Sequence, residues 1–124
     1  MVEPTSRIGV NRIDGGVAVI EVDGEHDLSN APRFREVVDG LLEAGSAVVV
    51  DLSAATFVDS SILATLLDAG RRTQARGAGF AVNMPDDADP AIRRVIDVTG
   101  LETALPFHTG LEDAIDAARP GVHA

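Results

Sequence analysis

The stretch of sequence that decides the fold is Val48-Val49-Val50-Asp51-Leu52-Ser53-Ala54-Ala55-Thr56-Phe57-Val58-Asp59-Ser60-Ser61. Its valine run does not alternate with polar residues, which is typical of a strand covered on both faces in the middle of a sheet. After a loop, Asp59 is suited to cap a second helix, which we expect to run to about Arg76. The hydroxyls of Ser60 and Ser61 then lie in the first helical turn, near the end of a strand, where functional groups of α/β folds often gather. An ordinary capped helix has the same local pattern, because aspartate and serine both favour helix starts.

The residues upstream predict a β-hairpin and then an amphipathic helix. Residues 7–13 and 17–22 have the composition of strands, and Asp14-Gly15-Gly16 between them tolerates the positive φ angles of a tight hairpin turn. Either Ser29 or Asn30 can cap the helix that follows, because both side chains accept hydrogen bonds from free backbone N–H groups. The buried stripe of this helix has the spacing of a single helix face and comprises Phe34, Val37, Val38, Leu41 and Leu42.

The residues downstream predict two more strands and two more helices. In chain order they are a strand over 79–84, a helix from Asp89 to Gly100, a short strand within 101–107 and a helix that ends by Pro120. Thr109 and Glu112 stand at capping-box spacing at the start of the last helix. The order β-β-α-β-α-β-α-β-α predicts an α/β fold, with a mixed β-sheet of about five strands covered by about four helices. At 124 residues the chain fits one compact domain.

The composition excludes several classes of function. Twenty acidic residues against ten basic ones give a formal net charge of −10, and such a surface repels the phosphates of nucleic acids. All the basic residues are arginines, so the missing lysine excludes Walker-A phosphate loops, Schiff-base chemistry and the active site of receiver domains. The chain has no cysteine, which excludes disulfides, thiol nucleophiles and cysteine-based zinc sites.

The N-terminal residues, the short apolar runs and the absence of cysteine predict a soluble protein of the cytoplasm that binds no membrane. The first residues, Met1–Arg7, lack the basic region and long apolar stretch of a signal peptide. No apolar run is longer than Ala47–Val50, far below the ~20 residues that a membrane-spanning helix requires. The absence of cysteine agrees with a reducing compartment.

Taken together, the pattern of a hydrophobic strand, Asp-Leu-Ser, a loop, Asp-Ser-Ser and a leucine-rich helix resembles the STAS family, particularly the bacterial anti-sigma factor antagonists. The resemblance extends over nearly the whole chain, from the leading hairpin to the last helix. It includes Gly24-Glu25-His26-Asp27, which is similar to the family's Gly-Glu-hydrophobic-Asp loop. The resemblance implies a single STAS domain over residues 1–124, with its core at about residues 7–119.

The resemblance also implies a function, that of a binding switch with no enzymatic activity, cofactor or metal. In the family, a partner anti-sigma factor kinase phosphorylates the serine that directly follows the aspartate, and this position is Ser60 here. A serine phosphatase reverses the modification, and the unmodified antagonist sequesters the kinase and releases a sigma factor. The partner-binding residues implied in this chain are Asp27, Asp59, Ser60, Ser61 and Ile62.

Two residues depart from the family's pattern. The family usually has a small residue, commonly glycine, after the paired hydroxyls, where this chain has Ile62. A β-branched residue there either crowds an approaching kinase or extends the buried face of the helix. His26 replaces the usual apolar residue of the Gly-Glu-x-Asp loop.

Other interpretations of the same residues are open. A STAS module can also bind a transporter ATPase or a sensory assembly without being phosphorylated. A hydrolase would need Ser60, His108 and an aspartate together, but the sequence has no Gly-x-Ser-x-Gly elbow. His26, His108 and His123 lack the spacing of metal ligands, and we interpret all three as solvated loop histidines. We interpret Asp86-Asp87-Ala88-Asp89 as a turn and a helix cap, because no glutamate occupies the twelfth position of a calcium loop.

Overall fold

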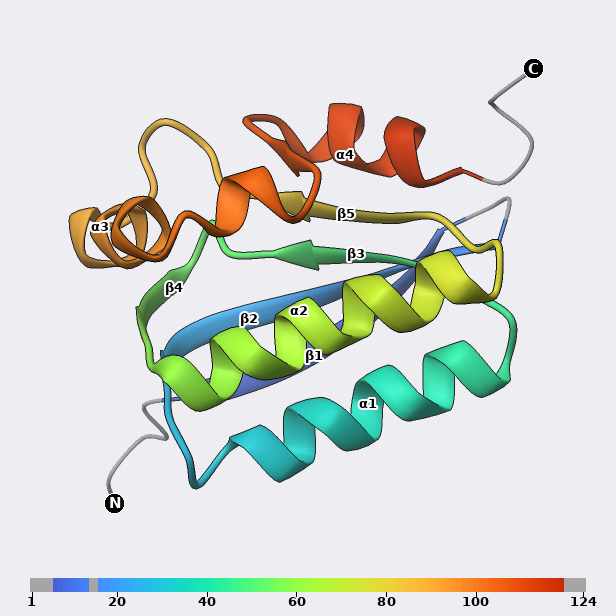
Figure 1. Cartoon of the computed structure of the whole chain (residues 1–124), viewed down its shortest axis with the longest axis horizontal. Coiled ribbons are helices and arrows are strands. Elements are labelled where there is room, and N and C mark those ends of the chain that lie inside the picture. The colour runs from blue at the N-terminus through green and yellow to red at the C-terminus, as the bar shows by residue number, and fades with distance from the viewer. Residues whose placement is uncertain (1–5, 14–15, 120–124) are drawn as a thin grey trace.

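A computed structural model of the chain describes residues 6–13 and 16–119. A β-sheet forms the middle layer, with α1 and α2 on one face and α4 on the other (Figure 1). The predicted turn residues Asp14 and Gly15 lie outside the described residues, as do Pro120 and His123. Within the described ranges, no helix combines the length and the apolar character that crossing a membrane requires.

The sheet is mixed, as the order of elements predicts. Its neighbouring strands run in the order β1-β2-β3-β5-β6, and β4 pairs separately with β2. The β1–β2 pair is antiparallel, and the other pairs are parallel. The six strands are β1 (Ser6–Ile13), β2 (Val17–His26), β3 (Ala47–Asp51), β4 (Ala55–Val58), β5 (Phe80–Asn83) and β6 (Phe107–His108).

Four α-helices connect and cover these strands, in agreement with the prediction. They are α1 (Ala31–Glu43), α2 (Ser60–Ala75), α3 (Pro90–Thr99) and α4 (Leu111–Ala118), with a short 3₁₀ helix at Leu101–Thr103. Gly100 ends α3 with a φ of 68°, in the left-handed region that glycine adopts without a Cβ clash. This position confirms the predicted end of the third helix.

The two faces of the sheet have separate hydrophobic clusters, because side chains of a strand alternate between faces. Ile20, Val48 and Val50 belong to the larger cluster beneath α1 and α2. Val19 and Val49 belong to the smaller cluster beneath α4. Every residue of β3 is buried, and β3 lies between β2 and β5, so the prediction of a doubly covered central strand is confirmed.

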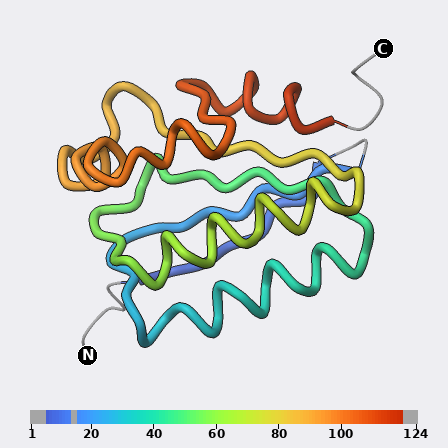
Figure 2. Tube along the Cα trace, in the orientation of Figure 1, coloured from blue at the N-terminus to red at the C-terminus, as the bar shows by residue number. Residues whose placement is uncertain are grey.

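The loop predicted before the second helix contains an additional strand, β4. After β3 the chain bends at residues 52–54 and continues beside the distal part of β2, as the trace in Figure 2 shows. Ala55 and Val58 are buried, whereas Thr56 and Phe57 are exposed. These four residues show no clear alternation of apolar and polar side chains, so the sequence does not predict a strand here. They form one because they pair with β2. Over residues 6–13 and 16–119 the sheet therefore has six strands, one more than the expected number of about five.

Near the C-terminus, the short strand predicted within 101–107 lies only at the end of that range. Leu101–Thr103 forms a 3₁₀ turn, and only Phe107 and His108 pair with β5. Leu101 and Leu105 are buried, but Thr103 between them is exposed, whereas a strand would place all three on one face. The predicted capping box at Thr109 was also wrong, because Gly110 occupies the N-cap position of α4.

Candidate functional site

Two loops meet at one end of the sheet and bring together four of the predicted site residues. His26 at the end of β2 pairs with Val58 at the end of β4. The N–H of Asp59 donates to the carbonyl of His26 at 3.3 Å. Because Asp27 directly follows His26, the loop after β2 and the start of α2 lie side by side (Figure 1). Asp27, Asp59, Ser60 and Ser61 therefore occupy one region of the surface.

Asp59 holds this region together. Its Oδ1 accepts hydrogen bonds from the N–H groups of Ser61 at 3.0 Å and Ile62 at 3.3 Å, which caps α2 as predicted. The same oxygen accepts the Ser61 hydroxyl at 2.5 Å, and Oδ2 accepts the N–H of Leu28 at 3.1 Å. These hydrogen bonds lower the pKa of Asp59, the Ser61 hydroxyl having the largest effect. The carboxylate thus fixes both the helix start and the loop that follows β2.

Asp27 organises its own loop in a similar way. Its Oδ1 accepts the hydroxyl of Ser29 at 2.6 Å and the N–H of Ser29 at 2.9 Å. These two bonds, with the hydroxyl first, lower the pKa of Asp27. Asn30 occupies the N-cap position of α1, but its side chain makes no capping bond and accepts the N–H of Asp27 instead. The predicted N-cap position at Asn30 is therefore confirmed, but the expected side-chain capping bond is not formed.

The two serines at the start of α2 differ in exposure and in bonding. Ser61 is half-buried, and its hydroxyl proton is directed to Asp59. Ser60 is the first residue of α2 and is exposed. Its hydroxyl forms no hydrogen bond with any residue in the described ranges. A reagent that approaches from solvent therefore meets the Ser60 oxygen free and the Ser61 oxygen already engaged.

Most of the chain matches one family model, which is described as Mlab, STAS domain and spans residues 10–111. The chain belongs to the STAS domain family. The anti-sigma-F factor antagonist RsfB of Mycobacterium tuberculosis is 31% identical over 108 residues, with 86% of this chain and 84% of RsfB covered. An anti-sigma F factor antagonist of Paenibacillus polymyxa is 26% identical over 102 residues, with 81% of this chain and 85% of that protein covered.

A solved structure of this STAS type supports the same assignment. The crystal structure of an anti-sigma factor antagonist from Mycobacterium paratuberculosis is similar to this chain with a TM-score of 0.77 and 32% identity. The similarity covers 96% of this chain and 99% of that one. The predicted resemblance to STAS anti-sigma factor antagonists, and the α/β fold that it implies, are confirmed.

Ile62 of this STAS domain lies in the core and is not a surface residue. Its side chain is 2% exposed and belongs to the larger hydrophobic cluster. Of the two roles considered for this departure from the family's pattern, the structure supports extension of the buried face. The same burial contradicts the prediction that Ile62 contacts a partner, because its side chain points into the protein.

His26 is buried, at 1% exposure, and the interpretation as a solvated loop histidine was wrong. Its Nε2 lies 2.8 Å from the carbonyl oxygen of Asp23. Since a carbonyl only accepts, Nε2 carries the proton, and Nδ1 is buried without a hydrogen-bond partner in the described chain. The sequence contained one signal for this position, because His26 has the same parity as the buried Ile20 and Val22 of β2.

Two exposed apolar residues beside the helix start were missed by the sequence analysis. Leu28 is 73% exposed and Phe57 is 45% exposed. Leu28 is tied to Asp59 through its backbone, and Phe57 lies two residues before Asp59 in β4. A shallow groove between the starts of α1 and α2 is lined by Leu28, Ala31, Pro32, Arg35, Ser61, Ala64 and Thr65. The only signal in the sequence was the presence of large apolar residues in segments expected to be loops.

The residues of a hydrolase are not arranged as such an enzyme requires. The Ser60 hydroxyl and His108 share no hydrogen bond in the part of the chain that the structure describes. Asp51 is buried, and its Oδ1 accepts the side-chain amide of Asn83 at 2.9 Å and the N–H of Ser53 at 3.0 Å. Asp51 therefore stabilises the ends of β3 and β5, and it does not orient a histidine.

Proposed function

We propose that this STAS protein is an anti-sigma factor antagonist whose binding to an anti-sigma factor serine kinase is controlled by phosphorylation of Ser60. The observation that carries the proposal is the contrast between the two serines at the start of α2. Ser60 has an exposed hydroxyl without a hydrogen-bond partner in the described chain, whereas the hydroxyl of Ser61 is bound to Asp59. The relatives named as anti-sigma factor antagonists support the coarser part of the proposal.

The local charges explain how one phosphate can control binding. Phosphorylation adds about −1.5 to −2 charges at neutral pH. Asp59 already accepts the N–H groups of Ser61 and Ile62, so a phosphate on Ser60 does not find those donors free. The phosphate therefore projects from the helix start into solvent, next to the carboxylates of Asp59 and Asp27. A partner that packs here must desolvate this charge, while the fold of the antagonist is unchanged.

The proposed contact surface comprises Asp27, Asp59, Ser60 and Ser61, with Leu28 and Phe57 as its apolar anchors. Exposed apolar side chains beside polar groups are typical of protein-binding surfaces. Replacement of either Leu28 or Phe57 by alanine should weaken kinase binding by about tenfold or more, the usual effect of removing an interface anchor. Val10→Ala is the matched control, because Val10 is 41% exposed on β1, across β2 from β4. Equal losses in all three variants would place the contact surface elsewhere.

The direct test of the function is phosphorylation by candidate anti-sigma kinases with ATP. Intact mass should show the addition of one phosphate to the protein, and phosphopeptide mapping should place it on Ser60. Ser60→Ala should remain unmodified and bind the kinase constitutively, while Ser61→Ala should still be modified. Label found on Ser61 or Thr56 alone would contradict the assignment. A serine phosphatase should restore binding of the modified protein.

The alternative function is a STAS module that binds a transporter ATPase or a sensory assembly without phosphorylation. It predicts that Ser60→Ala and the native protein bind their partner equally in the presence of ATP and every candidate kinase. The proposal made here predicts instead that ATP and the kinase abolish binding of the native protein but not binding of Ser60→Ala.

We also propose that the chain is one STAS domain over residues 1–124, with its core at about 7–119. Its regulatory partners imply a binding protein of the cytoplasm that is not an enzyme.

A further inference from the structure

A cavity of about 440 Å³ lies on α2, about two to four turns beyond the serines and separate from the site just described. It opens between the C-terminal half of α2, the start of β5 and the segment before β6. Its lining residues are Leu67, Gly70, Arg71, Gln74, Ala78, Phe80, Ala104, Leu105 and Pro106. Volumes of about 300–1,000 Å³ are usual for sites that bind small molecules.

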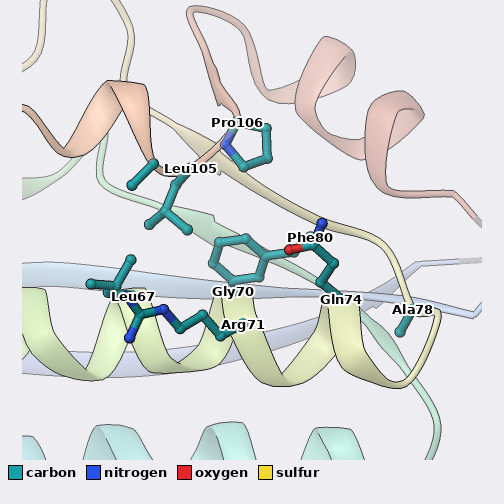
Figure 3. A pocket seen from close by; sticks show the side chains of 9 residues that line it. Leu67, Gly70, Arg71, Gln74, Ala78, Phe80, Leu105 and Pro106 are labelled. Atoms are coloured by element: carbon teal, nitrogen blue, oxygen red, sulfur yellow. The ribbon is translucent and has the colours of Figure 1, made fainter.

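The floor of the cavity is apolar, and a glycine shapes it. Figure 3 shows the ring of Phe80 between Leu105 and Gln74, with Pro106 above it. A Cβ at Gly70 would overlap Leu105 Cδ2 and lie 3.3 Å from Phe80 Cε2. Glycine at this position therefore lets both side chains approach α2 and form a continuous apolar surface.

The polar side chains of the cavity come from α2. Arg71 and Gln74 are both exposed residues of α2. Within residues 6–13 and 16–119, the guanidinium of Arg71 has no ion-pair or hydrogen-bond partner. The adjacent Arg72, by contrast, pairs with Asp39 at 2.5 Å and with Asp68 at 3.6 Å. The guanidinium of Arg71 is therefore available to an anion that enters the cavity.

We propose that this cavity binds a small amphipathic carboxylate, with its apolar chain or ring on Phe80 and Leu105 and its carboxylate on Arg71. Guanidinium groups bind carboxylates through charge-assisted hydrogen bonds. An apolar body with one anionic end matches the lining in both shape and charge. A neutral or cationic ligand of equal size would leave Arg71 unused. The proposal goes beyond the switch at Ser60 and does not depend on it.

The test uses octanoate as the probe and backbone amide NMR of the whole protein as the readout. Octanoate should cause saturable shifts in residues 67–74, 78–80 and 104–105. Octanol and octylammonium, which have the same chain without the anion, should bind at least tenfold more weakly. Arg71→Gln should weaken octanoate binding by about tenfold, which is the expected loss for one charge-assisted hydrogen bond.

Arg94→Gln is the matched control, because Arg94 is an exposed arginine of α3 with no role in the cavity. It should bind octanoate as the native protein does, and both variants should keep the native dispersion of amide signals. Shifts that do not saturate, shifts centred elsewhere, or equal affinities of the two variants would overturn the proposal. A response to a short peptide such as N-acetyl-phenylalanyl-glutamate amide, with none to octanoate, would also overturn it and assign the cavity to a protein partner.

Discussion

Replacement of Asp59 by alanine should destabilise the protein more than the loss of an ordinary helix cap. The Asp59 carboxylate accepts four hydrogen bonds, which come from the backbone of Ser61, Ile62 and Leu28 and from the hydroxyl of Ser61. Loss of an N-cap costs about 0.5–2 kcal/mol. The bond from Leu28 joins a second loop to the same group and adds about 1 kcal/mol. We therefore expect Asp59→Ala to lower the free energy of unfolding by about 1.5–3 kcal/mol.

The chain contains a matched control in Asp89, the N-cap of α3. Its side chain accepts a single hydrogen bond, from the N–H of Ala91 at 2.9 Å. Asp89→Ala should therefore cost about 1 kcal/mol. Asp59→Asn should fall between the two alanine variants, because asparagine caps helices well but puts an amide donor where Oδ2 accepts the N–H of Leu28.

Urea unfolding followed by circular dichroism measures all three variants, with the midpoint compared at an unchanged slope. A loss for Asp59→Ala that is equal to or smaller than the loss for Asp89→Ala would refute the reasoning. Such a result would mean that the contacts of Asp59 with Leu28 and with the Ser61 hydroxyl contribute nothing beyond capping.

Three further predictions concern the switch, the core and pH. Ser60→Ala should keep the native melting temperature, because Ser60 is exposed and alanine favours helices. Leu66→Ala should lower the free energy of unfolding by about 2–5 kcal/mol, because Leu66 is 2% exposed. Similar losses of melting temperature in the two variants would contradict the distinction between a switch residue and a core residue. The affinity for the kinase, measured by isothermal titration calorimetry, should decrease from the native protein to Ser60→Asp and then to the protein phosphorylated on Ser60, since aspartate carries one charge and phosphate up to two. Equal affinities of the three forms would eliminate Ser60 as the switch. The pKa values of Asp27 and Asp59 are lowered in the folded protein, so both ionised carboxylates stabilise the fold. This stabilisation is fully present above about pH 4 and is lost as the pH falls through the folded-state pKa values. In urea titrations from pH 6 to pH 2, the stability difference between the native protein and Asp59→Asn should shrink, and a constant difference would show that ionisation is not involved.

The sequence alone determined the elements that depend on local chemistry and on a repeated pattern. The stripe of Phe34, Val38 and Leu41 predicted α1, because a helix buries residues at a spacing of three and four. The uninterrupted valines of β3 predicted a central strand. Asp59 was identified as a cap because its role involves backbone groups within three residues. These features are encoded by neighbours in the chain.

Only the tertiary structure decided the features that depend on residues distant in the chain. Ala55–Val58 is a strand because β2 extends beyond β3 and leaves backbone groups for it to pair with. His26 is buried because β2 continues to His26 as a strand, which places that side chain on the same face as Ile20 and Val22. Ile62 was assigned to a partner surface by its place in a motif, but the direction of its side chain depends on how α2 packs on the sheet.

The choice between the two serines shows both contributions. The sequence placed Ser60 and Ser61 in one helical turn, and the family resemblance selected Ser60. The structure supplies a physical argument for the same proposal, because Asp59 accepts the hydroxyl of Ser61 and Ser60 is exposed. The rotation of α2 that produces this difference is set by the burial of Ile62 and Leu66 against the sheet. A linear sequence specifies which residues follow Asp59, but only the packed helix determines which of them faces solvent.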